Sequence, residues 1–241
     1  MSVAPSILEE LVPASNRLYF IFGGIAAEIG MPPFEFYNAS RILTENKIFL
    51  RDFSQSWYQN GLPGLGRDVY EIAERLAEKI RQVNPVDVYF VGNSMGGYAA
   101  ILFAALVGSG TAIAFAPQTF ISPISKLQHL DLRWPKQIAT TCFTTLAKRH
   151  VWDLKALLSA NQSTLKIEIH VSTKDRLDLM HARRLHGVSG TTIHEYDVGG
   201  HALVRYLRDE GRLSGILQGH RQPGLDVTRI SATSLASVCR G

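Results

Sequence analysis

The sequence predicts an α/β fold in which a mostly parallel central sheet carries helices on both faces. Six short segments rich in β-branched and aromatic residues alternate with stretches of helical spacing, a pattern typical of parallel sheets. In addition, a glycine-bounded turn around Ser94 joins one strand directly to an apolar helix. The predicted strands are at 17–22, 47–52, 86–91, 112–116, 165–172 and 191–197.

Two of the covering helices follow from periodicity and composition. Residues 66–83 place apolar side chains at helical spacing and charged side chains on the other face, and Asn84-Pro85 ends this helix. Residues 97–107 are rich in alanine and leucine, which predicts a buried helix that stops at Gly108 and Gly110.

Residues 119–163 break the alternation, because they are helix-prone and hold no clear strand. We predict a helical cap insertion over one end of the sheet, between the strand at 112–116 (the sixth-strand region) and the acid-bearing strand at 165–172. An ordinary crossover with two extra helices is the alternative. Residues 1–217 are then a single α/β domain, and 218–241, rich in serine, threonine and glycine, are predicted to be a poorly ordered tail.

Composition indicates a globular chain. Of 241 residues, 46% are hydrophobic and 19% are charged, which supports one substantial core. No apolar run is as long as a membrane span, and the acidic start is unlike a secretory signal, so we expect a cytoplasmic protein without stable membrane insertion. Cys142 and Cys239 are too far apart in sequence to indicate a disulfide framework or a metal cluster.

The net charge of +4 does not indicate a nucleic-acid partner, because the basic residues are scattered. Arg205, Arg208 and Arg212, for example, share one face of a predicted helix, which is typical of a solvated surface. No zinc-ligand spacing and no recognition-helix signature is present.

The segment Gly92-Asn93-Ser94-Met95-Gly96 is the most informative feature of the sequence. It follows the strand at 86–91 and opens the helix at 97–107. A reversal this sharp holds the serine in a strained conformation and exposes its hydroxyl at the sheet edge. Side chains at the flanking positions would collide with neighbouring elements, which explains the two glycines.

With this turn at the end of a central strand, the chain resembles the α/β-hydrolase fold superfamily over about residues 17–213. The resemblance implies a serine hydrolase whose acid and histidine follow the serine in chain order, each in a loop after a later strand. It implies no metal and no organic cofactor.

The base can be sought from chemistry alone, because a serine hydroxyl needs an imidazole to accept its proton. Among eight histidines, His201 follows the strand at 191–197 and the turn Gly199-Gly200, just before an apolar helix. Parallel strands end on the same side, so His201 is predicted at the sheet edge that carries Ser94. A helix-capping histidine is the alternative.

The imidazole needs a carboxylate to fix its tautomer. Asp175 is the first carboxylate after the strand at 165–172 and matches the acid position of the superfamily, so it is our preferred candidate. Asp178 is the rival, and either aspartate could instead be a helix N-cap.

The developing oxyanion needs hydrogen-bond donors. The backbone N–H of Met95, directly after the serine, is the first candidate, and the resemblance puts the second in the loop after the strand at 17–22. Ile25 is our choice there and Gly24 the next, although many relatives have His-Gly where this chain has Gly23-Gly24.

These residues predict acyl transfer to water, with a small-molecule carboxylic ester as the substrate. A thioesterase or an acyltransferase on the same triad is the alternative, since both reactions use the same groups. A basic insertion could favour an anionic acyl carrier, and its basic residues are Lys126, Arg133, Lys136, Lys148 and Arg149. Gly24, Trp57 and Trp134 are candidates for the substrate pocket, with ordinary packing as the alternative for the two aromatic residues. A protein that binds ligands or partners without chemistry is the competing class.

Overall fold

The computed structural model describes residues 5–25, 36–160 and 165–219, without the side chains of 146–148. One seven-stranded sheet has the order β1-β3-β2-β4-β5-β6-β7. All neighbouring strands pair in parallel except β1 with β3. The strands are β1 (Ile7–Glu10), β2 (Arg17–Phe22), β3 (Asn46–Leu50), β4 (Asp87–Asn93), β5 (Thr111–Phe115), β6 (Lys166–Ser172) and β7 (Thr191–Tyr196). The predicted mostly parallel sheet is confirmed.

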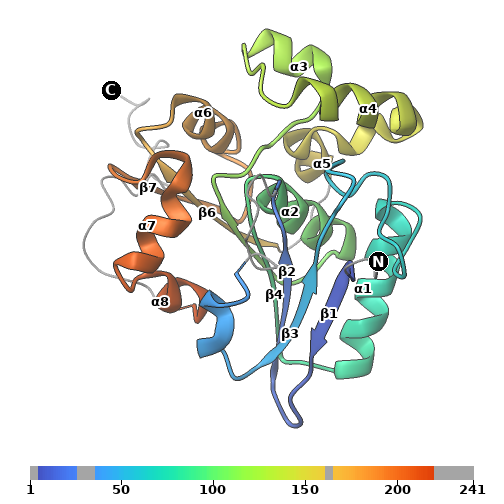
Figure 1. Cartoon of the computed structure of the whole chain (residues 1–241), viewed down its shortest axis with the longest axis vertical. Helices are drawn as coiled ribbons and strands as arrows, with labels where there is room; N and C mark the ends of the chain where they lie inside the picture. Colours follow the sequence, from blue (N-terminus) through green and yellow to red (C-terminus); the bar gives the residue numbers. More distant parts are fainter. Residues whose placement is uncertain (1–4, 26–35, 161–164, 220–241) are drawn as a thin grey trace, which may run out of the picture.

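Helices cover both faces of this sheet (Figure 1). The α-helices are α1 (Val69–Val83), α2 (Met95–Val107), α3 (Pro123–Gln128), α4 (Pro135–Thr145), α5 (Leu154–Ala160), α6 (Arg176–Arg184), α7 (Leu203–Asp209) and α8 (Leu213–Leu217). The 3-10 helices of the described residues are η1 (Ala39–Ile42), η2 (Leu146–Val151) and η3 (Gly200–Ala202).

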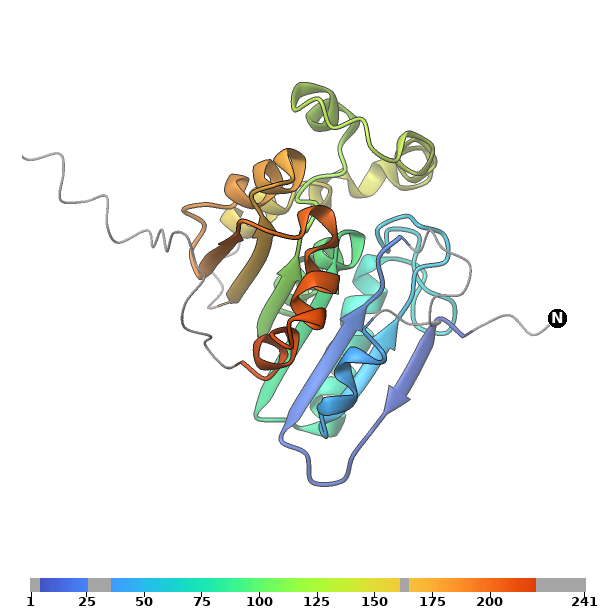
Figure 2. The ribbon, with the colours of Figure 1, turned by 60° about the vertical axis from the view of Figure 1, so that its left-hand side comes forward.

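Strand β2 shows why the sheet is buried on both faces. Leu18, Phe20 and Phe22 pack into the core beneath α1 and α2, whereas Tyr19 and Ile21 pack into the core beneath α7 and α8. Side chains alternate along a strand, so a continuous apolar run fills two cores. Figure 2 shows α7 and α8 in front of the sheet from a second direction.

Strand β1 is not among the predicted strands, and it pairs antiparallel with β3 at the edge of the sheet. This strand has only four residues, and two of them are glutamates, so it lacks an apolar pattern. Ion pairs accommodate both acids: Glu10 contacts Lys47 at 2.8 Å, and Glu9 contacts Lys79 at 3.0 Å.

Residues 119–160 contain the helices α3, α4, η2 and α5, and α3 and α4 lie beyond the end of the sheet at which the parallel strands finish (Figure 1). The predicted tail, 218–241, lies outside the described residues from 220 onward. In the described part of the chain, no helix has both the length and the apolarity needed to cross a membrane.

Candidate active site

Ser94 stands in a strained turn between β4 and α2. Its backbone has φ 55° and ψ −114°, outside the regions that side chains favour, at a cost of about 1–3 kcal/mol. The turn is held on both sides, because the Ser94 N–H donates to the Phe115 carbonyl at 2.9 Å and the Ser94 carbonyl accepts from the Tyr98 N–H at 3.0 Å. The predicted strain at the serine is confirmed, whereas the predicted exposure is not, because Ser94 is buried with 6% of its surface exposed.

The two glycines of the turn leave no room for a side chain. A Cβ at Gly92 would lie 2.1 Å from the Gly96 carbonyl oxygen, and a Cβ at Gly96 would lie 2.2 Å from the Phe22 carbonyl oxygen. The start of α2 therefore packs directly against the end of β2.

That contact bears on the predicted oxyanion donors. Met95 is the first residue of α2, where backbone N–H groups have no acceptor within the helix. Gly24 and Ile25 follow the end of β2 and are half-buried. Met95 thus begins a helix whose start contacts the end of β2, and Gly24 and Ile25 follow that end of β2.

His201 lies in η3, directly after β7, as predicted. Gly199 and Gly200 turn the chain there with φ values of 85° and 53°. The Gly200 N–H donates to the Ser172 hydroxyl at 3.1 Å, so this turn lies against the end of β6. The His201 Nδ1 then lies 2.5 Å from Asp178 Oδ2.

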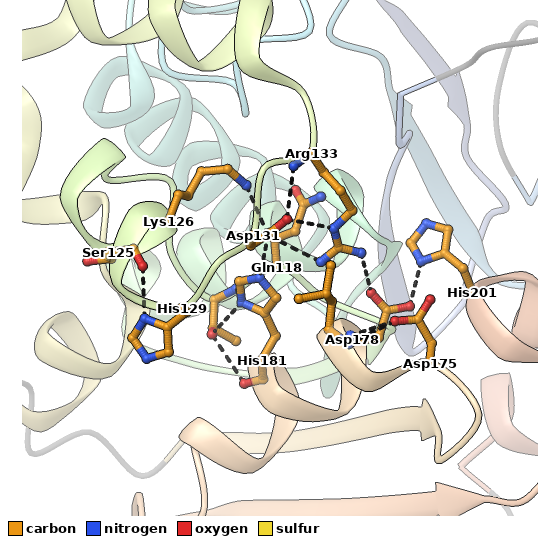
Figure 3. A network of polar contacts seen from close by, with 12 residues as sticks. Gln118, Ser125, Lys126, His129, Asp131, Arg133, Asp175, Asp178, His181 and His201 are labelled. Atoms are coloured by element: carbon orange, nitrogen blue, oxygen red, sulfur yellow. Dashed lines mark hydrogen bonds and ion pairs between the residues drawn. The ribbon is translucent and has the colours of Figure 1, made fainter.

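The acid that contacts His201 is Asp178, not the preferred candidate Asp175. Asp175 is the N-cap of α6, and its carboxylate accepts the N–H groups of Leu177 and Asp178 at 3.0 Å each. Asp178 stands one helical turn further on and is 1% exposed, with its carboxylate toward His201 (Figure 3). Position after the strand favoured Asp175, but that side chain satisfies the helix terminus instead.

The contact between His201 and Asp178 determines which ring nitrogen of His201 carries the proton. A carboxylate only accepts, so Nδ1 of His201 carries the proton and Nε2 keeps its lone pair in the neutral ring. The hydrogen bond that His201 donates to Asp178 outweighs burial and raises the pKa of His201 above its usual value. Burial opposes the charge of Asp178, yet hydrogen bonds from His201 and Arg133 hold the pKa of that carboxyl below its usual range.

Arg133 is a further residue at this site, which the sequence reading treated only as part of a basic insertion. Its Nη1 donates to Asp178 Oδ1 at 2.7 Å, opposite the oxygen that faces His201. Its remaining donors bind Asp131, which also pairs with Lys126 at 2.9 Å (Figure 3). Lys126 and Arg133 are thus engaged inside the protein, which weakens the hypothesis of a basic surface for an anionic carrier.

The two pocket aromatics differ in burial. Trp57 has no exposed surface and donates its indole N–H to Gln118, which favours a packing role. Trp134 is half-buried against the same core and precedes α4.

An open depression of about 830 Å³ lies between the 62–67 loop and the outer side of α1. None of Ser94, Asp178 and His201 lines it. Its basic side chains pair with acids, for example Arg75 with Glu78 at 2.8 Å. We therefore do not consider this depression a candidate active site.

Two groups of side chains among the described residues bring possible metal-ligand atoms within 4.8 Å of one another. They are Asp175, Asp178 and His201, and Glu168, His170 and His194. In the first group, the Nδ1–H of His201 already donates a hydrogen bond to Asp178. In the second, the rings of His170 and His194 stack at 4.6 Å and 9°, and parallel rings do not aim their in-plane lone pairs at one ion. Hydrogen bonding and stacking account for both groups.

Comparisons with protein families and with curated proteins each find no match. Solved structures do match. The capsule O-acetyltransferase of Neisseria meningitidis serogroup A has a TM-score of 0.64 at 14% identity, over 88% of this chain and 90% of that chain. The fluorophosphonate-binding serine hydrolase FphF of Staphylococcus aureus has 0.57 at 18%, over 90% and 85%. MenH from S. aureus has 0.54 at 14%, over 89% and 97%.

The chain therefore has the α/β-hydrolase fold. The similar structures include a lipase-esterase related protein and other enzymes of this type, and they confirm the resemblance predicted from the turn at Ser94. At 14–18% identity such likeness establishes the fold and not the reaction.

Proposed function

We propose that this protein is a serine hydrolase that cleaves a carboxylic ester through an acyl-serine intermediate. Ser94 is the nucleophile, His201 the general base and Asp178 the acid that orients the imidazole. The observation that carries the proposal is the hydrogen bond between His201 and the buried Asp178, at the sheet edge where Ser94 occupies a strained turn.

The topology of the sheet supports a common site for Ser94, Asp178 and His201, which are far apart in the sequence. Ser94 follows β4, Asp178 follows β6 and His201 follows β7, and these strands run parallel. Strands β5 and β6 lie between β4 and β7. Three spacings of about 4.8 Å place β4 and β7 about 14 Å apart, so the chain after β7 has to turn toward β4 for His201 to approach Ser94. The hydrogen bond from Gly200 to Ser172 holds it in that direction.

Each of these residues then has one role in the reaction. The Ser94 hydroxyl attacks the ester carbonyl while His201 Nε2 takes its proton, and Asp178 stabilises the imidazolium that forms. Backbone N–H groups of Met95 and of Ile25 or Gly24 stabilise the oxyanion. The imidazolium returns the proton to the leaving alcohol, and water repeats the sequence to release the acid.

Acyl transfer is the second candidate, with a thioester as donor and an alcohol in place of water. The observation in its favour is the likeness to the capsule O-acetyltransferase, one of whose structures is a complex with CoA. Graded ester and thioester panels, with and without alcohol acceptors, distinguish the two: a hydrolase releases free acid at the same rate whether or not the alcohol is present.

A fluorophosphonate probe tests whether Ser94 is a nucleophile. We expect the native chain to be labelled at one position and the Ser94→Ala variant not at all, because only an activated serine displaces fluoride from the probe. The measurement is the intact mass after labelling. Equal labelling of both proteins would move the nucleophile elsewhere, and no labelling of either would favour a binding protein without catalysis.

A further inference from the structure

Arg133 divides its guanidinium between two buried carboxylates. Nη1 contacts Asp178 Oδ1 at 2.7 Å, while Nε and Nη2 contact the two oxygens of Asp131 at 2.9 and 3.2 Å. The planar fork of arginine suits this double contact, which a lysine cannot reproduce. Figure 3 shows the guanidinium between the two acids, with His201 on the far side of Asp178.

Asp131 anchors the other end of the guanidinium and is completely buried. It also accepts from Lys126 Nζ at 2.9 Å and from His181 Nε2 at 3.0 Å. The Thr119 backbone N–H donates to His181 Nδ1, so the single proton of the neutral ring is on Nε2 and points at Asp131. Burial lowers the pKa of His181 and keeps it neutral.

The charges of this cluster balance. Two carboxylates, Asp131 and Asp178, face two basic side chains, Lys126 and Arg133, when both histidines are neutral. Loss of Arg133 would leave Asp178 buried with His201 as its only charge partner among these groups. A buried carboxylate without its cation favours protonation of a neighbouring imidazole.

We propose that Arg133 is a positioning residue that acts on His201 through Asp178: it binds Oδ1 of that carboxylate while His201 binds Oδ2, and it offsets part of the negative charge that faces the imidazole. It also joins the α3–α4 segment to that acid. This inference rests on the proposed function for its catalytic meaning. The geometry that carries it is a salt bridge from residue 133, between α3 and α4, to residue 178 on α6.

The sign of the effect on His201 follows from the charges that face it, which are those of Asp178, Asp175 and Arg133. Asp178, mainly through its hydrogen bond, and Asp175 raise the pKa of His201, whereas Arg133 lowers it. Removal of the Arg133 charge should therefore raise that pKa, protonate more of the base at neutral pH and move the acidic limb of activity upward.

The test is an NMR titration of the His201 imidazole in the full chain, assigned by its loss in His201→Ala. We expect Arg133→Met to raise the pKa of His201 by on the order of one unit. Arg133→Lys keeps the charge without the planar fork, so the pKa of His201 in this variant should lie between those of the native protein and of Arg133→Met. Lys126→Met is the matched control, since it removes a cation from Asp131 without touching Asp178, and it should leave the pKa of His201 unchanged.

Three results would overturn the proposal: no change in Arg133→Met, a fall in the pKa, or an equal rise in Lys126→Met. If Arg133→Met does not fold, Arg133→Gln, which removes the charge but keeps hydrogen-bond donors, takes its place, and an unchanged pKa of His201 in that variant counts against the proposal. The titration needs no turnover. A shifted pKa in a protein that hydrolyses no ester would keep the role of Arg133 and reject the proposed function.

Discussion

Replacing His201 by alanine is expected to lower ester turnover by about four to six powers of ten, because the serine then has no base to accept its proton. The measurement is kcat for p-nitrophenyl ester hydrolysis, with enzyme concentration corrected for folded protein. The loss should fall on kcat, since the imidazole acts on the transition state more than on substrate binding.

His186→Ala is a suitable control for this variant. His186 is exposed beyond the end of α6, and its removal should leave turnover unchanged. External imidazole should restore part of the activity of His201→Ala if the lost group is a base. Full turnover in His201→Ala would move the base to another histidine.

Asp178→Asn is the second large effect, with an expected loss of about four powers of ten in kcat. An asparagine can present its amide N–H to His201 and so favour the wrong tautomer of the ring, with the proton on Nε2. It also removes the charge that stabilises the imidazolium. Asp175→Asn should change kcat only a few-fold by comparison, because asparagine caps a helix about as well as aspartate.

The two substitutions are matched in size and charge and lie one helical turn apart, so their ratio separates orientation of His201 from helix capping. Melting temperatures measured alongside report any loss of folding, which matters because Asp178 also pairs with Arg133. Equal effects of the two variants, or a larger effect of Asp175→Asn, would reject Asp178 as the acid.

Much of the fold could be predicted because its signals are local. The sequence predicts strand β2 at its observed bounds, since the apolar run after Arg17, which fills two cores, has a plain pattern. Helix α1 was placed within three residues at its start, and it begins where the Asp68 side chain accepts from Tyr70 and Glu71 N–H. The turn at Ser94 was readable because steric demands at Gly92 and Gly96 admit only glycine.

The acid and its surroundings could not be predicted in the same way. Asp175 and Asp178 are three residues apart, and only the path of the chain after β7 decides which carboxylate meets His201. Arg133 reaches Asp178 across 45 residues of sequence, and spacing carries no sign of that contact. Long-range ion pairs of this kind depend on tertiary packing rather than on a local pattern.

The central claim is that the reactivity of Ser94 depends on the His201–Asp178 pair. The rate constant for fluorophosphonate inactivation, measured across pH, tests it most directly. Since Asp178 raises the pKa of His201, the native rate should rise with pH through a midpoint above 6.5. The rate should collapse in His201→Ala and fall steeply in Asp178→Asn. Equal rates in all three proteins, with no dependence on pH near the histidine range, would contradict the claim.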